Sequence, residues 1–211
     1  MNNKSRTPLL QDVCLIDEGW LNKYLLTYLL PNGDIQTYES VSRKKFREYK
    51  AALGLEGKLE NPDAICIVPH TLQDEIVLIK EFRYPLNNWC ISLPAGLMEP
   101  TESIESCVAR ELKEETGYGL LSANGRPLIQ PLPQFGYSST GMTDETIQVV
   151  YAMVGKMGDP EPEPTEFIEV FTLPSADIAS FLKENTLPIG TRCQLILQSY
   201  VISQHMQERE D

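Results

Sequence analysis

Long hydrophobic runs and paired cysteines are absent from this 211-residue sequence. No apolar run approaches the roughly eighteen residues that a membrane-spanning helix needs, and residues 1–12 resemble neither a signal peptide nor a basic targeting helix. We therefore expect a soluble, cytoplasmic protein. The five cysteines are scattered without a Cys-x-x-Cys pair, which favours ordinary buried thiols over disulfides, a zinc site or a redox role.

Positive charge is also scarce. Lysine and arginine number 18 against 30 aspartates and glutamates, so the formal net charge is −12. This balance excludes broad electrostatic binding to nucleic acid or to an anionic membrane surface, because both partners need a basic surface. A small anionic substrate would have to be received by a few well-placed arginines and by metal ions that reverse the local potential.

Composition and turn signals predict one full domain with a small appendage, since 42% of the residues are apolar. Residues 24–30 and 35–41 are strand-like and flank a Pro-Asn-Gly-Asp turn, which predicts a hairpin in a small N-terminal antiparallel β subdomain. The charged segment 42–58 is the expected boundary. We therefore predict a small subdomain of residues 1–57 and a main domain of residues 58–211.

The main domain reads as an α/β fold with a mixed sheet. Its β-rich runs are residues 63–68, 75–82, 89–93, 146–154 and 167–173. Residues 159–165 contain alternating prolines and must form a loop. Two C-terminal helices are expected at about 175–184 and 191–207. The inward-facing residues expected on the second helix include Leu195, Ile196, Tyr200 and Val201.

A further helix is predicted over residues 104–116. Ser103 is a suitable N-cap, and Gly117 can adopt the left-handed conformation that ends a helix. The helix is apolar along one face at its start and becomes acidic along the same face.

Two carboxylates continue the buried stripe of this helix. At about 100° per residue, Ile104, Val108, Glu111 and Glu115 fall on one line. Like charges one turn apart repel, and carboxylates beside apolar surface are costly to desolvate, so the pattern indicates a cation bound between them. Glu114 lies beside them, and hard divalent ions such as Mg²⁺ or Mn²⁺ prefer oxygen ligands of this kind.

The residues around this helix occur at characteristic spacings. They are Gly96, Glu102, Arg110-Glu111-Leu112, Glu114-Glu115 and Gly117. This spacing resembles the Nudix box, from which Tyr118 departs at a position that is usually aliphatic. The resemblance implies an α/β/α sandwich and a hydrolase whose metal ligands are Glu111, Glu114, Glu115 and the carbonyl of Ala95. We interpret Glu102 and Arg110 as an ion pair that holds the loop to the helix.

The sequence on either side of the box indicates which branch of the family the chain resembles. Residues 81–96, EFRYPLNNWCISLPAG, together with Pro133 and residues 166–170, resemble the ADP-sugar pyrophosphatase branch, especially the ADP-ribose hydrolases. That branch implies hydrolysis of a small nucleotide-sugar, ADP-ribose or a related ADP-sugar, to AMP and a sugar phosphate. It also implies a homodimer that exchanges N-terminal parts. Two alternatives remain open: a module that binds ADP-ribose without cleaving it, and a Nudix hydrolase of another nucleoside diphosphate derivative such as an oxidised nucleotide.

The resemblance also implies substrate contacts. Arg83, and Arg43 from the partner subunit, are expected to bind the diphosphate, because a guanidinium fork suits phosphate oxygens. Surface ion pairs are the alternative for both. Trp20 and Tyr38 are expected to stack on the adenine, with a place in the subdomain core as the alternative. Met142 is expected near the terminal ribose.

Hydrolysis needs a base that accepts a proton from water. Glu166 follows the proline-rich loop and resembles the loop glutamate of the ADP-ribose branch, so it is the expected base. The catalytic set is then Glu166, Glu115 and Glu111. The rivals for the role of base are Glu163, Glu161 and Glu145.

Overall fold

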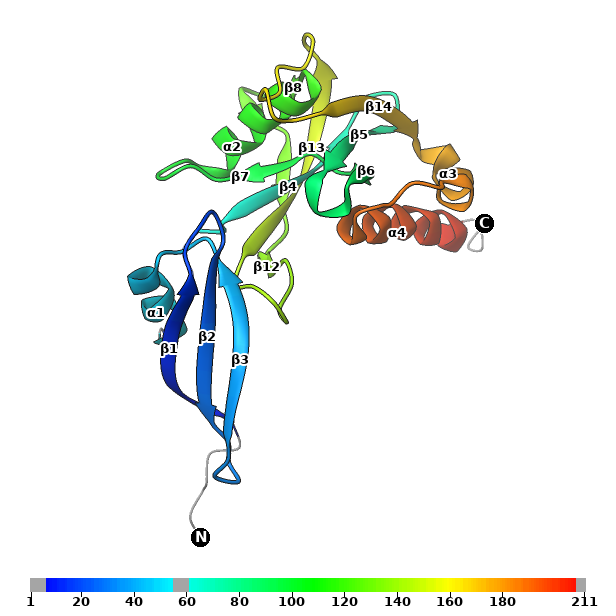
Figure 1. Ribbon diagram of the computed structural model, residues 1–211. Helices are drawn as coiled ribbons and strands as arrows, with labels where there is room; N and C mark the ends of the chain where they lie inside the picture. Colours follow the sequence, from blue (N-terminus) through cyan, green and yellow to red (C-terminus); the bar gives the residue numbers. More distant parts are fainter. Residues whose placement is uncertain (1–6, 55–60, 208–211) are drawn as a thin grey trace. The chain divides into compact units, whose positions relative to one another are not determined.

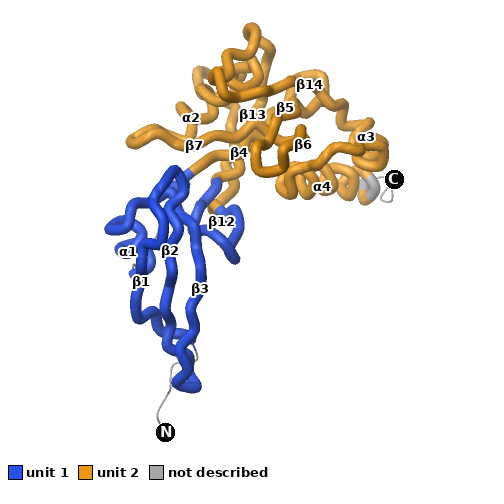
Figure 2. The backbone as a smooth tube through the Cα atoms, viewed as in Figure 1, with its two compact units in different colours: residues 1–63, 136–147 blue, residues 64–135, 148–211 orange. Residues whose placement is uncertain are grey.

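The computed structural model describes residues 7–54 and 61–207 and divides the chain into two compact units. The first unit comprises residues 1–63 and 136–147, and the second comprises residues 64–135 and 148–211 (Figure 2). The predicted boundary between residues 57 and 58 lies outside the described residues. Sequence reasoning did not anticipate that residues 136–147 group with the N-terminal part of the chain.

The first unit is built on a three-stranded antiparallel sheet (Figure 1). Its strands, in the order β1-β2-β3, are β1 (Leu9–Asp17), β2 (Asn22–Leu29) and β3 (Ile35–Ser42). The β2–β3 hairpin confirms the prediction. Strand β1 was missed, because two register shifts interrupt its alternation.

A helix and a small aromatic core complete this sheet. Helix α1 (Phe46–Gly54) occupies the segment that was expected to be only a boundary. Its Tyr49 stacks on Tyr24 of β2 with 4.2 Å between ring centroids, and both side chains are buried with Val13 and Leu26. Since a two-stranded hairpin is marginal alone, β1 and α1 supply the apolar surface that the predicted hairpin needed.

The second unit is built on a larger sheet with the strand order β11-β13-β4-β5-β14. These strands are β4 (Ala64–His70), β5 (Glu75–Arg83), β11 (Ile129–Pro131), β13 (Thr146–Lys156) and β14 (Ile168–Pro174). Shorter strands pair with them: β6 (Asn88–Ser92) with β5, β7 (Ala95–Leu97) with β4, and β8 (Tyr118–Leu120) with β13. Strand β12 (Gly136–Tyr137) pairs with Thr146 and Ile147 at the start of β13, and these four residues belong to the first unit. Strands β9 (Ser122–Ala123) and β10 (Arg126–Pro127) form a separate hairpin. The strands expected from the sequence are all present, and the α/β fold class with its small N-terminal antiparallel sheet is confirmed.

Helix α2 (Ile104–Glu111) covers one face of this sheet and ends in a wider turn than predicted. The Ser103 side chain accepts a hydrogen bond from the Ser106 amide, which confirms the N-cap. The last turn is a π-helical turn, η2 (Leu112–Thr116), rather than α-helix, and Gly117 follows with φ of +68°. Such turns inside helices occur frequently at functional sites.

Helices also lie on the opposite face, as the alternation along β4 shows. Ile65 and Ile67 pack in the cluster that contains Val108 of α2. The intervening Cys66 interacts with Arg192 at the start of α4 (Thr191–Gln207). Because successive strand residues face opposite sides, α2 and α4 cover opposite faces, which gives the expected α/β/α arrangement. A short helical turn η3 (Ser175–Asp177) and α3 (Ile178–Glu184) precede α4.

The inward face of α4 differs from the prediction at one position. Cys193, Leu197 and Val201 are buried at a four-residue spacing, whereas Leu195 is 65% exposed. Two residues correspond to about 200° of helical rotation, so Leu195 points away from the stripe that begins at Cys193. The prediction that Leu195 faces inward was wrong.

The cysteines are free thiols, and four of the five are buried, as expected; Cys14 is exposed. In the part of the chain that the structure describes, no helix combines the length and apolar character needed to cross a membrane.

Candidate active site

The acidic end of the α2 stripe is buried in the second unit. Val108 is fully buried, and Glu111 and Glu115 retain only 8% and 5% of their exposure. The two carboxylates therefore continue the buried line of the helix, as the periodicity indicated. This position is unfavourable for two negative charges unless cations or hydrogen-bond donors compensate them.

The backbone of β7 lies directly against both carboxylates. The Ala95 amide donates a 3.0 Å hydrogen bond to Oε2 of Glu115. A Cβ placed on Gly96 would lie 1.8 Å from Oε1 of Glu111, so only glycine leaves room for that carboxylate in the position it occupies here. Pairing with β4, in which Ala95 is opposite Cys66, holds this backbone in place.

Arg110 places a positive charge directly against this group of glutamates. Its Nη1 donates to Glu111 at 2.6 Å and to Glu114 at 3.2 Å. Its Nε and Nη2 donate to the two carboxylate oxygens of Glu102 at 3.1 and 3.0 Å. The predicted Glu102–Arg110 ion pair is confirmed. The contacts of Arg110 with Glu111 and Glu114 were not predicted, because Arg110 was interpreted only as the ion-pair partner of Glu102.

The electrostatics of the site favour a bound cation. Burial raises the pKa of Glu115 well above its usual value, and the negative charge of Glu111 raises it further. The hydrogen bond from the Ala95 amide lowers this pKa, whereas the charges of Glu81 and Glu166 raise it. Burial likewise raises the pKa of Glu111. Arg110 lowers this pKa, and the charges of Glu114 and Glu166 raise it. A divalent cation would reverse these shifts by favouring the charged carboxylates.

The donor set fits a hard divalent ion, since it consists of carboxylate and backbone oxygens. Within residues 7–54 and 61–207, no three acidic, histidine or cysteine side chains are already gathered as a metal cage. The carboxylates of Glu111 and Glu114 are not gathered as a cage partly because the Arg110 guanidinium bridges them. A cation would compete with Arg110 for these oxygens.

Comparison with known proteins assigns the chain to a family. Residues 60–189, more than half of the chain, match the NUDIX domain. The chain belongs to the NUDIX family. The resemblance expected from the spacing of the box is thereby confirmed.

Relatives of this NUDIX protein include enzymes that act on ADP derivatives. It is 34% identical over 181 residues to an ADP-sugar pyrophosphatase of Mus musculus, covering 80% of this chain and 74% of the relative. It is 30% identical over 160 residues to an ADP-ribose pyrophosphatase of Saccharomyces cerevisiae, covering 74% of this chain and 65% of the relative. A crystal structure of an ADP compounds hydrolase matches with a TM-score of 0.69 and 20% identity, covering 96% and 95% of the two chains. That structural match supports the fold alone.

Glu166 is the candidate base whose charge acts on both buried carboxylates of the NUDIX domain. Its amide donates to the Glu163 carbonyl at 2.9 Å, and the Glu163 amide donates to Oε2 of Glu166 at 3.0 Å. The rival Glu161 forms an ion pair with Lys113. Glu145 is in the first unit and is paired with Arg43.

Arg83 ends β5 and forms the surface ion pair that was the alternative for it, with a partner that the sequence analysis did not identify. Its Nη1 donates to Oε1 of Glu81 at 2.6 Å, while 53% of its side chain remains exposed. Residues two apart on a strand face the same side, and this spacing was the available signal for Glu81. Glu81 therefore interacts with two charged groups: it forms an ion pair with Arg83, and its charge raises the pKa of the buried Glu115.

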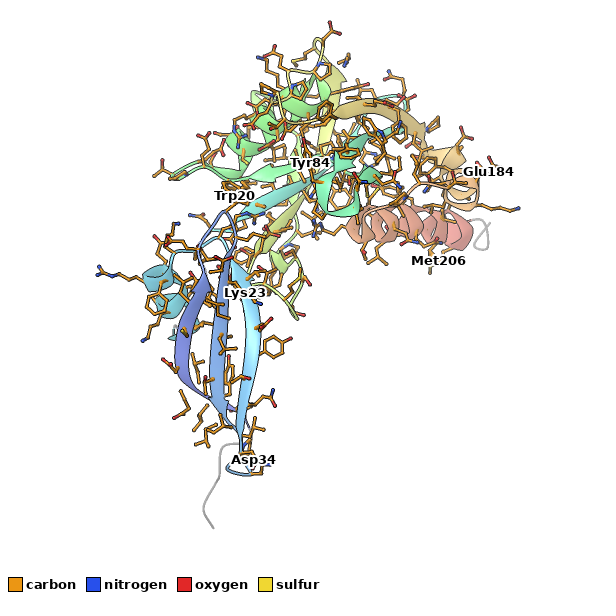
Figure 3. The ribbon with its side chains drawn as sticks, viewed as in Figure 1. Trp20, Lys23, Asp34, Tyr84, Glu184 and Met206 are labelled. Carbon is orange, nitrogen blue, oxygen red and sulfur yellow. The ribbon has the colours of Figure 1, made fainter. Side chains whose placement is uncertain are left out.

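Three of the substrate-binding candidates in the first unit present their side chains to solvent. Trp20, labelled in Figure 3, lies between β1 and β2. It is 74% exposed and Tyr38 on β3 is 48% exposed, so neither is a core aromatic. The Tyr38 hydroxyl donates to the Gly141 carbonyl at 2.7 Å. The carbonyl of Met142 accepts from the Val41 amide at 2.9 Å, and its side chain is 57% exposed. The structure thus brings Tyr38 and the Met142 loop together.

Proposed function

We propose that this NUDIX protein hydrolyses the diphosphate bond of ADP-ribose or a related ADP-sugar, releasing AMP and a sugar phosphate, with Mg²⁺ as its cofactor and Mn²⁺ as a substitute. The names of the mouse and yeast relatives support the substrate class. One structural observation carries the chemistry: Glu111 and Glu115 are buried beside the Ala95 backbone with raised pKa values.

The residues that would hold the metal are Glu111, Glu114, Glu115 and the carbonyl of Ala95. A bound divalent ion supplies neutralisation of the diphosphate and activation of water. Glu166 is suited to accept the proton of that water, because its carboxylate acts electrostatically on Glu111 and Glu115 from a separate loop.

The remaining candidates bind and orient the substrate. Arg83 binds the diphosphate through guanidinium N–H groups, and Arg43 of a second protomer contributes a further fork. Trp20 and Tyr38 stack on the adenine, which their exposed rings support. Met142 contacts the terminal ribose. In this proposal the protein is a cytoplasmic homodimer, and residues 1–57 complete the site of the partner formed by residues 58–211.

Activity with single variants tests the chemistry. The wild-type protein should release AMP from ADP-ribose when Mg²⁺ is present. Glu115→Gln should lower kcat by on the order of 10²-fold or more, and Glu166→Gln by roughly 10²- to 10⁴-fold while ADP-ribose still binds. Glu161→Gln, in the same loop, is the matched control and should keep wild-type kcat. Near wild-type turnover by Glu115→Gln would disprove the metal assignment.

The same assays separate the alternatives. Calorimetric binding of ADP-ribose without AMP release over hours would identify a non-hydrolysing module. A panel of nucleoside diphosphate derivatives would reveal a different preferred substrate, such as an oxidised nucleotide. For the dimer, an active monomer in light scattering would exclude a shared role for Trp20, Tyr38 and Arg43.

A further inference from the structure

In the chain, Glu166 lies between two residues whose backbone carbonyls accept hydrogen bonds from the end of β5 and the turn that follows it. The Phe82 amide donates to the Phe167 carbonyl at 3.0 Å. The Tyr84 hydroxyl donates to the Thr165 carbonyl at 3.1 Å. The two residues that flank Glu166 in the chain are therefore both attached to one short stretch of residues, 82–84.

Tyr84 is itself fixed in place, although 64% of it is exposed. It begins the helical turn η1 (Tyr84–Leu86), in which Pro85 restricts the backbone and the Asn87 amide donates to the Tyr84 carbonyl at 3.0 Å. Its ring packs edge-on against Phe82, with 5.6 Å between centroids and an interplanar angle of 87°. The hydroxyl therefore projects from a ring that packs against Phe82 and from a backbone that Pro85 restricts.

The loop before Glu166 has few other attachments to the rest of the unit. Residues 159–165 contain three prolines and form no helix or strand. The Glu161 amide donates to the Glu114 carbonyl at 2.8 Å, and the reciprocal bonds between Glu163 and Glu166 close a turn within the loop. In the described part of the chain, Tyr84 is the one side chain outside the loop that hydrogen-bonds to the loop backbone between residues 162 and 166.

We propose that Tyr84 is a positioning residue for Glu166: by holding the Thr165 carbonyl, its hydroxyl sets where the Glu166 carboxylate lies relative to Glu111 and Glu115. This inference rests on the proposed function, in which Glu166 is the base. Small displacements of a catalytic group are costly, since an error of about 1 Å can reduce the rate by roughly 10²-fold. Loss of one neutral hydrogen bond permits only part of such a displacement.

Tyr84→Phe tests the proposal, because it removes the hydroxyl and keeps the ring against Phe82. We expect kcat for ADP-ribose to fall by about 3- to 10-fold with KM changed by less than about twofold. In a Glu166→Gln background the same substitution should have no further effect, since no base remains to be positioned. Tyr28→Phe is the control, because no described residue hydrogen-bonds to the Tyr28 hydroxyl in the N-terminal sheet, and it should leave kcat unchanged.

Two results would overturn the role of Tyr84. They are wild-type kcat in Tyr84→Phe, and an equal loss of kcat in the Glu166→Gln background. Failure of the proposed function would show separately, as absence of AMP release by the wild type or full activity of Glu166→Gln. Amide exchange in a peptide spanning residues 160–167 tests the attachment without any activity: Tyr84→Phe should exchange faster, and equal exchange would refute the attachment.

Discussion

Gly96→Ala should disable the acidic site while leaving the fold largely intact. The added Cβ would lie 1.8 Å from Oε1, 1.9 Å from Cδ and 2.4 Å from Oε2 of Glu111, whereas Cβ contacts below 3.0 Å essentially never occur. The Glu111 carboxylate must therefore move by about 1.2 Å. That movement would also break its 2.6 Å hydrogen bond with Arg110.

The effect on stability should be small. The atoms that clash are at the end of a flexible side chain rather than in the backbone, and Gly96 does not have positive φ. We expect the free energy of unfolding to change by no more than about 1 kcal/mol. The effect on activity should be large, because a displacement of about 1 Å at a reacting centre costs roughly 10²-fold in rate.

The assay is AMP release from ADP-ribose at increasing Mg²⁺ concentrations. Gly96→Ala should lower kcat by on the order of 10²-fold and raise the Mg²⁺ concentration for half-maximal activity by about 10- to 100-fold. Gly158→Ala is the matched control, because a Cβ there meets no atom within 4 Å and its φ is not positive. Wild-type kcat and unchanged Mg²⁺ dependence in Gly96→Ala would show that Glu111 does not hold the metal where this structure places its carboxylate.

Two further predictions concern stability and pH. The Arg110 guanidinium lowers the pKa of Glu102 to about 2 from 4.5, so the pair stabilises the fold above pH 4.5 and this contribution is lost as pH falls toward 2. Glu102→Gln should cost on the order of 1–3 kcal/mol at pH 7 in urea unfolding, and a difference from wild type that fails to shrink below pH 4.5 would contradict this. Burial lowers the pKa of His70 below 6.5, against the charge of Asp74, and its ring nitrogen hydrogen-bonds to the Tyr200 hydroxyl. Because the unfolded chain then binds the proton more tightly, stability should fall as pH drops below about 6.5, and His70→Phe should flatten the melting temperature between pH 7 and pH 5.

Local signals in the sequence determined much of the fold. Ser103 and Gly117 marked the helix ends, because a capping hydroxyl and a residue tolerant of positive φ act on their own neighbours. The period of the helix placed Glu111 and Glu115 on the buried stripe for the same reason. The turn of residues 31–34 set the register of the β2–β3 hairpin.

Elements that depend on distant partners could not be predicted in this way. Strand β1 has a weak and interrupted alternation, and it is stabilised by pairing with β2. Leu195 was predicted to face inward because it is apolar. The buried face of α4 instead follows the residues spaced by four from Cys193, which do not include Leu195. Apolar side chains also occur on protein surfaces, so hydrophobicity alone does not specify direction.

The same division holds for the candidate site. The sequence by itself determined which carboxylates belong to the acidic stripe, because their spacing along one helix is a local property. Only the tertiary structure decided that Gly96 must lack a side chain beside Glu111, that Glu81 pairs with Arg83, and that Tyr84 holds the loop of Glu166. Some of these contacts join segments that are far apart in the chain and meet only in the folded protein. Others depend on the direction in which an individual side chain points. They follow from packing, which the order of residues along the chain does not display.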